Sequence, residues 1–369
     1  MDFDRDIDLE RDYKIVDSDR RRGRGARSNA SGRYERERRE DFDDGWETLG
    51  ELETFRTTVQ PELAKSIIAT NDSPDLSFDQ SINPYRGCEH GCSYCYARPS
   101  HAQMGLSPGL DFETKIFAKV NAAELLEEAF RRKRYVPKTI ALGAVTDAYQ
   151  PAEKRLQIAR SVLEVLDRFN HPVGIVTKSA LVVRDIDILS RMAERRLVKV
   201  ALSVTSLDRQ VVRKMEPRAA TPDRRLAAIR DLSQAGIPTT VMVAPIIPGL
   251  NDHEIESILK AAKEAGAESA SYVMLRLPLE LKELFREWLS TEFPNRSGRV
   301  IKLLQGMHHG RDYISEFGHR QRGTGPFAEM IGNRFRKALK RHQLNQRELK
   351  LRTDLFQVPA EVGQQLGLI

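Results

Sequence analysis

The chain has 369 residues and a net charge of +6, and its pI is near 9.1. It has only three cysteines, all within eight positions, which excludes a disulfide scaffold and favours a metal site in a reducing compartment. No run of eighteen apolar residues and no signal-peptide pattern is found, so we expect a cytoplasmic protein without a membrane span. The basic charge suggests a polyanionic partner.

Charged side chains dominate residues 1–50. An arginine-rich run at 20–24 and a mixed run of arginine and acidic residues at 36–41 contain few apolar side chains. Such a segment cannot bury enough surface to offset the entropy of ordering it, so residues 1–50 are predicted to be a disordered tail. The tail either serves solubility alone or binds nucleic acid. Residues 51–80 then lead into the folded part, with a strand expected around Thr57–Val59.

Short β-branched runs alternate with helical stretches between residues 81 and 295, the predicted core domain. The expected strands are Phe117–Val120, Thr139–Val145, Pro172–Thr177, Val198–Val204, Pro238–Ile246 and Ser271–Leu275. This alternation predicts βαβ units around a parallel sheet. We expect an α/β fold, a partial (β/α)6 barrel related to the TIM barrel. An open doubly wound sheet is the alternative, but no phosphate-binding glycine pattern follows the first strand.

The alternation ends beyond Phe293, and residues 296–369 are expected to form a basic C-terminal extension with an amphipathic helix over Phe327–His342. The basic residues predicted to contact a polyanion are Arg322, Arg334, Arg336, Lys337, Lys340 and Arg341. A basic stripe of this kind is the electrostatic footprint of nucleic-acid binding. A solvated helical face is the alternative interpretation.

The cysteines Cys88, Cys92 and Cys95 have the spacing C-x3-C-x2-C, in a loop expected at the carboxyl ends of the strands. Three thiolates can ligate three irons of a [4Fe–4S] cluster, which leaves the fourth iron open to a small molecule. A structural zinc site completed by His90 or His101 is the alternative.

Residues 83–98 read NPYRGCEHGCSYCYAR, with an aromatic residue directly before the last cysteine. The cysteine motif resembles the signature of radical S-adenosylmethionine (SAM) enzymes. Its flanking residues resemble the spore photoproduct lyase-like branch, often labelled DNA repair photolyases. The resemblance implies a [4Fe–4S] cluster, SAM, a reducing partner such as flavodoxin or ferredoxin, and a 5′-deoxyadenosyl radical that abstracts hydrogen from a substrate.

The resemblance also implies residues that bind SAM, with Tyr94 in the position beside the adenine. The other candidates follow strands: Asp147 for the amino group, Lys178 for the carboxylate or a substrate phosphate, Ser203 and Thr205 for ribose or carboxylate, and Gly249 beside the adenine. Each has a simpler alternative. Asp147 would cap a helix, Lys178 would be an exposed loop lysine, the hydroxyls would bond local backbone, and Gly249 would form a turn.

The chain departs from the branch in having no fourth cysteine. Enzymes of this branch use a further cysteine to return hydrogen to the substrate radical, so repair of spore photoproduct by that route is not expected here. Tyr96 matches a tyrosine near the radical path, and Tyr149 is a second candidate donor. We therefore expect a radical SAM enzyme acting on DNA or another nucleic acid. The alternatives are a protein or small-molecule substrate, or a nucleic-acid-binding protein with a structural zinc or Fe–S site.

Overall fold

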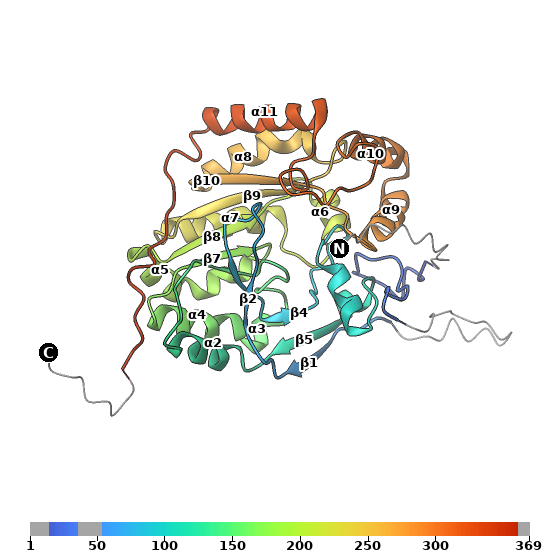
Figure 1. Ribbon diagram of the computed structural model, residues 1–369. Coiled ribbons are helices and arrows are strands. Elements are labelled where there is room, and N and C mark those ends of the chain that lie inside the picture. The colour runs from blue at the N-terminus through green and yellow to red at the C-terminus, as the bar shows by residue number, and fades with distance from the viewer. Residues whose placement is uncertain (1–14, 36–53, 361–369) are drawn as a thin grey trace.

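The computed structural model describes residues 15–35 and 54–360. Its main sheet has seven strands in the order β10-β9-β8-β7-β6-β3-β2, and all neighbouring pairs are parallel except β2 with β3 (Figure 1). The strands are β2 (Ile68–Thr70), β3 (Gln80–Ile82), β6 (Ile140–Leu142), β7 (Val173–Thr177), β8 (Val198–Ser203), β9 (Thr239–Ile246) and β10 (Ser269–Met274). The predicted α/β fold with a parallel sheet is confirmed.

Helices connect the parallel strands. They include α2 (Ala122–Arg131), α3 (Glu153–Leu156), α4 (Ile158–Arg168), α5 (Ile186–Glu194), α6 (Arg209–Met215), α7 (Pro222–Gln234), α8 (Ile255–Glu264) and α9 (Leu281–Glu292), with short 3-10 helices η3 (Ala180–Asp185) and η4 (Asp252–Glu254). Apolar residues at helical spacing explain their packing, since α4 buries Ile158, Val162 and Leu166 along one face. The core lies between these faces and the sheet.

A second sheet of three strands has the order β1-β5-β4 and contains β1 (Thr58–Glu62), β4 (Tyr85–Arg86) and β5 (Lys115–Lys119). The strand expected at Phe117–Val120 corresponds to β5, but the prediction that it belongs to the main sheet is wrong. Ile116 and Ala118 are buried while their neighbours are half-buried, and β5 pairs with β1 and β4. In the main sheet its expected place beside β6 is taken by β3, which precedes β4 and the cysteine loop.

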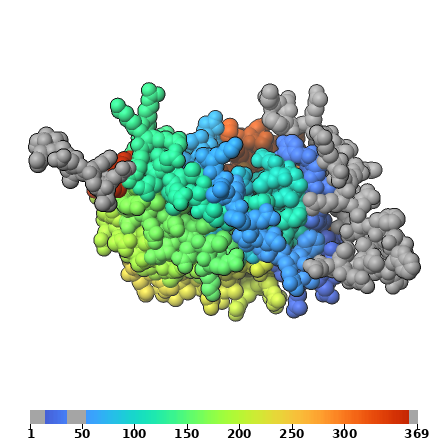
Figure 2. Space-filling model, turned by 90° about the horizontal axis from the view of Figure 1, so that it is seen from below, coloured from blue at the N-terminus to red at the C-terminus, as the bar shows by residue number. Residues whose placement is uncertain are grey.

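Residues 15–35, here called the N-terminal segment, lie against the rest of the protein. Figure 2 shows this darkest blue segment beside the teal part of the chain. Arg24 donates hydrogen bonds to the carbonyls of Glu113 and Phe55, and the Glu113 carboxylate accepts from the amides of Gly25 and Ala26. The predicted disorder is therefore wrong for this segment, because buried hydrogen bonds hold it in place together with the packing of Val16 and Ala26 against Leu110. Residues 1–14 and 36–50 of the predicted tail lie outside the described residues.

The C-terminal extension contains α10 (Pro294–Gly306) and α11 (Gly325–Arg341), and α11 lies over α8 and β10 (Figure 1). The Met274 amide donates to the carbonyl of Gln321 before α11, whereas Asn345 after α11 bonds the backbone of Ala270. The helix therefore runs from the carboxyl end of β10 to its amino end. None of the described helices is long and apolar enough to cross a membrane.

Candidate active site

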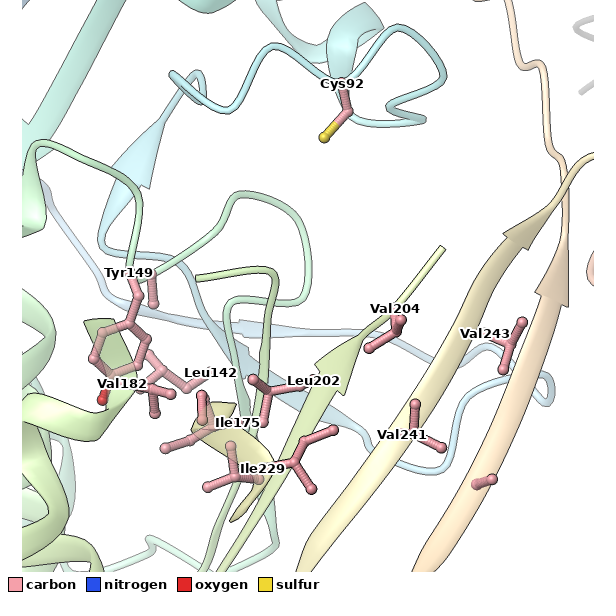
Figure 3. Close-up of a cluster of buried hydrophobic side chains, with 14 of the residues drawn as sticks. Cys92, Leu142, Tyr149, Ile175, Val182, Leu202, Val204, Ile229, Val241 and Val243 are labelled. Atoms are coloured by element: carbon pink, nitrogen blue, oxygen red, sulfur yellow. The ribbon is translucent and has the colours of Figure 1, made fainter. Parts of the chain in front are cut away.

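The three cysteines lie on a loop between β4 and the 3-10 helix η2 (Arg98–Met104), beyond the carboxyl ends of the parallel strands. Cys88 and Cys92 are buried, Cys95 is half-buried, and all three thiols are free. The sulfur of Cys92 points from the loop toward the side of the sheet on which Leu142 and Leu202 lie (Figure 3). This is the end of a parallel α/β sheet at which ligands bind.

The buried side chain of Arg98 fixes the shape of the cysteine loop. Its Nε donates to the carbonyl of Cys92 (2.9 Å), one Nη donates to the carbonyl of Gly109 (2.9 Å), and the other Nη pairs with Glu113 on the short helix α1 (Asp111–Thr114). The ion pair between Arg98 and Glu113 is completely buried and hydrogen-bonded, so it holds the cysteine loop in place without any bound metal.

Segments that follow β6 and β8 support the same loop from the other side. The Glu89 amide donates to Gln150, whose Nε2 donates to the carbonyl of Gly87 (2.9 and 3.2 Å). The Ser93 amide donates to the carbonyl of Met215, and the Arg218 amide donates to the carbonyl of His90 (3.0 and 3.3 Å). Contacts from several strand ends therefore converge on the cysteines.

Burial makes free thiolates unfavourable in this loop. It raises the pKa of Cys88 well above its usual value and the pKa of Cys92 to about 12. Lys178 lies nearby, with its Nζ 5.8 Å from the centre of the Tyr94 ring. Burial lowers the pKa of Lys178, but the charges of Cys92 and Glu216 outweigh this effect and raise it, so the ammonium stays charged. Iron would supply the positive charge that buried thiolates need, so the donor set fits a cluster.

The zinc alternative lacks a suitable fourth ligand in this geometry. His90 Nδ1 lies 3.3 Å from Asp147, while His101 Nε2 contacts the carbonyl of Lys115 and its ring packs edge-on against Phe112. Across residues 15–35 and 54–360, no three His, Cys, Asp or Glu side chains converge on one metal ion. In a cluster each thiolate binds a different iron, so convergence on one point is not required.

Asp147 is held by protein groups on both carboxylate oxygens. Oδ1 accepts from the Thr177 hydroxyl (2.7 Å) and the Tyr149 amide (2.9 Å), and Oδ2 accepts from the Lys178 amide (2.8 Å). Although burial opposes it, contact with His90 and these donors lowers the pKa of Asp147. Asp147 therefore joins the ends of β6 and β7 to the cysteine loop. The contact of Asp147 with the SAM amino group stays a prediction, whereas the alternative of a helix cap is wrong, because α3 begins only at Glu153.

Tyr94 is buried beside a pair of charges that sequence reasoning missed. Its hydroxyl donates to Glu216, directly after α6, and Glu216 pairs with Arg225 of α7. Glu216 and Arg225 are both buried, and the Arg225 Nη1 also donates to the carbonyl of Ser203 at the end of β8 (2.9 Å). Nothing in the sequence marks these two residues, since only folding brings them to the cysteine loop.

The remaining predicted SAM contacts differ in their placement. Ser203 and Thr205 are both buried at the end of β8, and the Thr205 hydroxyl is inaccessible and has no hydrogen-bond partner. Gly249 lies in a turn with φ +75°, and a Cβ atom there would lie 3.3 Å from Leu303 of α10. Gly249 thus faces α10 rather than the cysteine loop, and its turn interpretation is the better one.

The two candidate tyrosines are in different environments. Tyr96 is 41% exposed, its hydroxyl donates to the carbonyl of Ala144, and the guanidinium of Arg276 lies 4.9 Å from its ring centre. Tyr149 is fully buried, and Figure 3 shows its hydroxyl pointing away from Cys92. Burial and then the charge of Asp185 raise the pKa of Tyr149. Tyr149 is therefore a core residue in this structure, which favours Tyr96 over Tyr149 as the hydrogen donor.

The predicted basic stripe is divided between opposite ends of the sheet. Arg322 lies near the carboxyl end of β10, with its guanidinium 3.8 Å from the Tyr272 ring centre. Arg334 pairs with Glu256 of α8 and is neutralised there. The other four basic residues, Arg336, Lys337, Lys340 and Arg341, are exposed toward the end of α11, which lies at the amino end of β10. These residues therefore do not form one continuous surface with the cysteine loop.

A parallel α/β sheet with a loop of three free thiols at its ligand-binding end is the arrangement expected of an enzyme that depends on an iron–sulfur cluster. Residues 82–262 match the family model described as the radical SAM superfamily. The chain is 35% identical to an uncharacterised protein of Mycobacterium tuberculosis over 251 residues, which cover 67% of this chain and 73% of that one. It is 27% identical to an uncharacterised protein of Methanocaldococcus jannaschii, over 58% of this chain and 76% of that one.

Solved structures of spore photoproduct lyase share the fold. The complex with dinucleoside spore photoproduct gives a TM-score of 0.56 at 16% identity, covering 77% of this chain and 79% of that one. A mutant with bound SAM and the same dinucleoside gives 0.55 at 17% identity over the same shares. The chain belongs to the radical SAM superfamily. It is a radical SAM enzyme, and its cofactors are a [4Fe–4S] cluster and SAM.

Proposed function

We propose that this radical SAM enzyme acts on a nucleic acid, with Cys88, Cys92 and Cys95 as the ligands of its cluster, on a partial (β/α)6 barrel. The observation that carries the proposal is the loop of three free cysteines, fixed by Arg98 and Glu113 at the carboxyl ends of six parallel strands. The three cysteines would hold the cluster, which when reduced would supply the one electron that divides SAM into methionine and a 5′-deoxyadenosyl radical, the species that takes hydrogen from the substrate.

Residues around the loop would bind and orient SAM. The charged ammonium of Lys178 lies near Cys92, where it can pair with the SAM carboxylate. The unpartnered hydroxyl of Thr205 offers a buried hydrogen bond to the carboxylate or the ribose, with Ser203 beside it at the end of β8. Tyr94, held by Glu216, would present a fixed aromatic face to the adenine.

Two observations support a nucleic acid as substrate. Arg276 and Arg322 place positive charge at the carboxyl end of β10, and Arg276 lies over the exposed Tyr96. The fold is shared with a lyase whose solved complex contains a dinucleoside photoproduct. Because all three cysteines are committed to the cluster, we propose that Tyr96 lies on the path of hydrogen transfer and that the reaction differs from repair completed by a cysteine. The electron would come from a cytoplasmic donor such as flavodoxin or ferredoxin.

Deuterium transfer tests the choice of substrate. Reconstituted enzyme is incubated anaerobically with SAM, dithionite and deuterated single-stranded DNA, and the mass of the 5′-deoxyadenosine is measured. We expect deuterium in this product with DNA and none with a deuterated peptide mixture as control. Deuterium gained from the peptides and not from DNA would favour the alternative, a protein substrate.

A further inference from the structure

Side-chain contacts bridge the two edge strands of the main sheet. Asp75, in the turn between β2 and β3, accepts hydrogen bonds from the Gly318 amide (2.7 Å) and from Arg320 Nε (2.6 Å). The next residue, Gln321, bonds β10 through the Met274 amide (2.9 Å). Residues 318–322 therefore cross from the β2 edge to the carboxyl end of β10, and both carboxylate oxygens of Asp75 are already occupied.

Two arginines, Arg276 after β10 and Arg322 at the end of this bridge, are each held against a tyrosine. The Arg276 guanidinium lies over the Tyr96 ring, and that of Arg322 lies over the Tyr272 ring. Tyr272 is in turn fixed by Phe335 of α11, at a centroid distance of 4.6 Å. Stacking orients a guanidinium while its N–H edge stays free to bind an anion in a bidentate manner.

Neither of these arginines is neutralised within the part of the chain that the structure describes. No carboxylate there forms an ion pair with Arg276 or Arg322, and the buried Nε of Arg276 has no hydrogen-bond partner. The pKa of Asp75 is lowered first by the hydrogen bond from the Gly318 amide, then by Arg320, and least by the charge of Arg276. Arg276 is therefore near Asp75, but both carboxylate oxygens of Asp75 are already bonded to Gly318 and Arg320. A buried unpaired N–H is costly, and a bound anion would satisfy it.

We propose that Arg276 and Arg322 form a phosphate-binding subsite for a single-stranded nucleic acid at the mouth of the active site. The inference rests on the proposed function and names how its substrate is held. Two guanidiniums at the carboxyl end of β10, without a carboxylate partner among the described residues, suit successive phosphates of one strand better than a single carboxylate. The exposed ring of Tyr96 directly follows Cys95, so a base stacked on it would lie next to the cluster loop.

Binding of a fluorescent single-stranded DNA oligonucleotide to the full-length protein without cluster or SAM tests the subsite. We expect Arg276→Ala and Arg322→Ala each to weaken binding about tenfold and to reduce the slope of log K against log salt by about 1. Arg322→Lys keeps the charge but loses the planar fork of the guanidinium, so its affinity for DNA should lie between those of the wild-type protein and Arg322→Ala. The matched control removes two lysines at the far end of α11, Lys337→Ala with Lys340→Ala, and should change binding less than twofold.

Three outcomes would overturn the subsite: no DNA binding by the wild-type protein, equal effects of the α11 control and the β10 variants, or equal competition by an acidic peptide of the same charge. Thermal melting shows whether each variant is folded, and Arg322→Lys provides a readout if an alanine variant is not. SAM cleavage by reconstituted wild-type enzyme without DNA is measured separately. If it is absent while DNA binding depends on both arginines, the proposed function fails and the subsite stands.

Discussion

Gly25 lies so close to Gly91 that a Cβ atom at position 25 would come within 1.7 Å of the Gly91 carbonyl oxygen. Gly91 is part of the cysteine loop, whereas Gly25 belongs to the N-terminal segment, which the amides of Gly25 and Ala26 attach to Glu113. Because Glu113 also pairs with Arg98, the N-terminal segment and the cysteine loop share one buried carboxylate. The segment is thus a part of the active-site framework.

Gly25→Ala should separate the N-terminal segment from the loop. The added methyl group meets backbone atoms that cannot move aside, so we expect a loss of about 1–3 kcal/mol of stability and a lower iron content after reconstitution. The control is Gly298→Ala in α10, where a Cβ atom meets nothing within 4 Å. Iron and sulfide analysis with thermal melting measures both variants. Equal iron content in the two would contradict the role given to the segment.

The N-terminal segment also shows where sequence reasoning failed. Composition predicted disorder because few apolar residues are present, but Arg24 is buried by hydrogen bonds to backbone carbonyls far along the chain. Such contacts depend on where Glu113 and Phe55 lie after folding, and composition carries no information about them. By contrast, the strands of the main sheet from Thr139 onward were predictable, because each is a local apolar run followed by a helix with its own periodicity.

The residues of the candidate site also divide into those that the sequence predicts and those that it does not. The cysteines could be found from their spacing, and Lys178 because it directly follows a strand and the strand ends of a parallel sheet lie together. Glu216 and Arg225 could not, because their importance comes from a contact with Tyr94 across the fold. The sequence also could not show that the side chain of Tyr149 turns into the core, because that depends on the packing of the folded chain.

Glu216→Gln should lower the free energy of unfolding more than Tyr94→Phe does. The glutamine leaves the buried guanidinium of Arg225 without a counter-charge, for which we expect a cost of about 3–5 kcal/mol in the free energy of unfolding. Phenylalanine at 94 removes one hydroxyl from Glu216 and should cost about 1 kcal/mol. Urea denaturation of the protein without cofactors measures both values. Equal losses would show that the ion pair does not stabilise the fold around Tyr94.

Glu287 on α9 should make stability depend on pH. Burial raises its pKa from 4.5 to about 7, against the opposing effects of the Ser28 hydrogen bond and Arg27. The folded state therefore retains a proton that the unfolded state releases, so this stabilisation is complete below pH 4.5 and is lost as pH rises through 7. Glu287→Gln should remove the dependence, and its stability relative to wild type should rise by up to about 3 kcal/mol between pH 5 and 8. Urea unfolding at four pH values tests this, and parallel curves for the two proteins would contradict it.

Tyr96→Phe and Tyr149→Phe should have separable effects. The exposed Tyr96 lies beside Cys95 and Arg276, so loss of its hydroxyl should reduce the yield of product per SAM cleaved by about tenfold or more. Tyr149 has a buried hydroxyl without a hydrogen-bond partner, so Tyr149→Phe should leave this ratio unchanged and alter stability by less than about 1 kcal/mol. The ratio of nucleic-acid product to 5′-deoxyadenosine is the measurement. A loss caused by Tyr149→Phe alone would restore Tyr149 as the donor.

The central claim is that Cys88, Cys92 and Cys95 hold a cluster that cleaves SAM. Its most direct test is the amount of 5′-deoxyadenosine formed by anaerobically reconstituted protein with dithionite and SAM, compared with a variant in which the three cysteines are alanine. We predict that the wild-type protein, with four irons and four sulfides per chain, forms 5′-deoxyadenosine and methionine, and that the variant forms neither. A wild-type protein with its full complement of iron and sulfide that forms no 5′-deoxyadenosine would contradict the account.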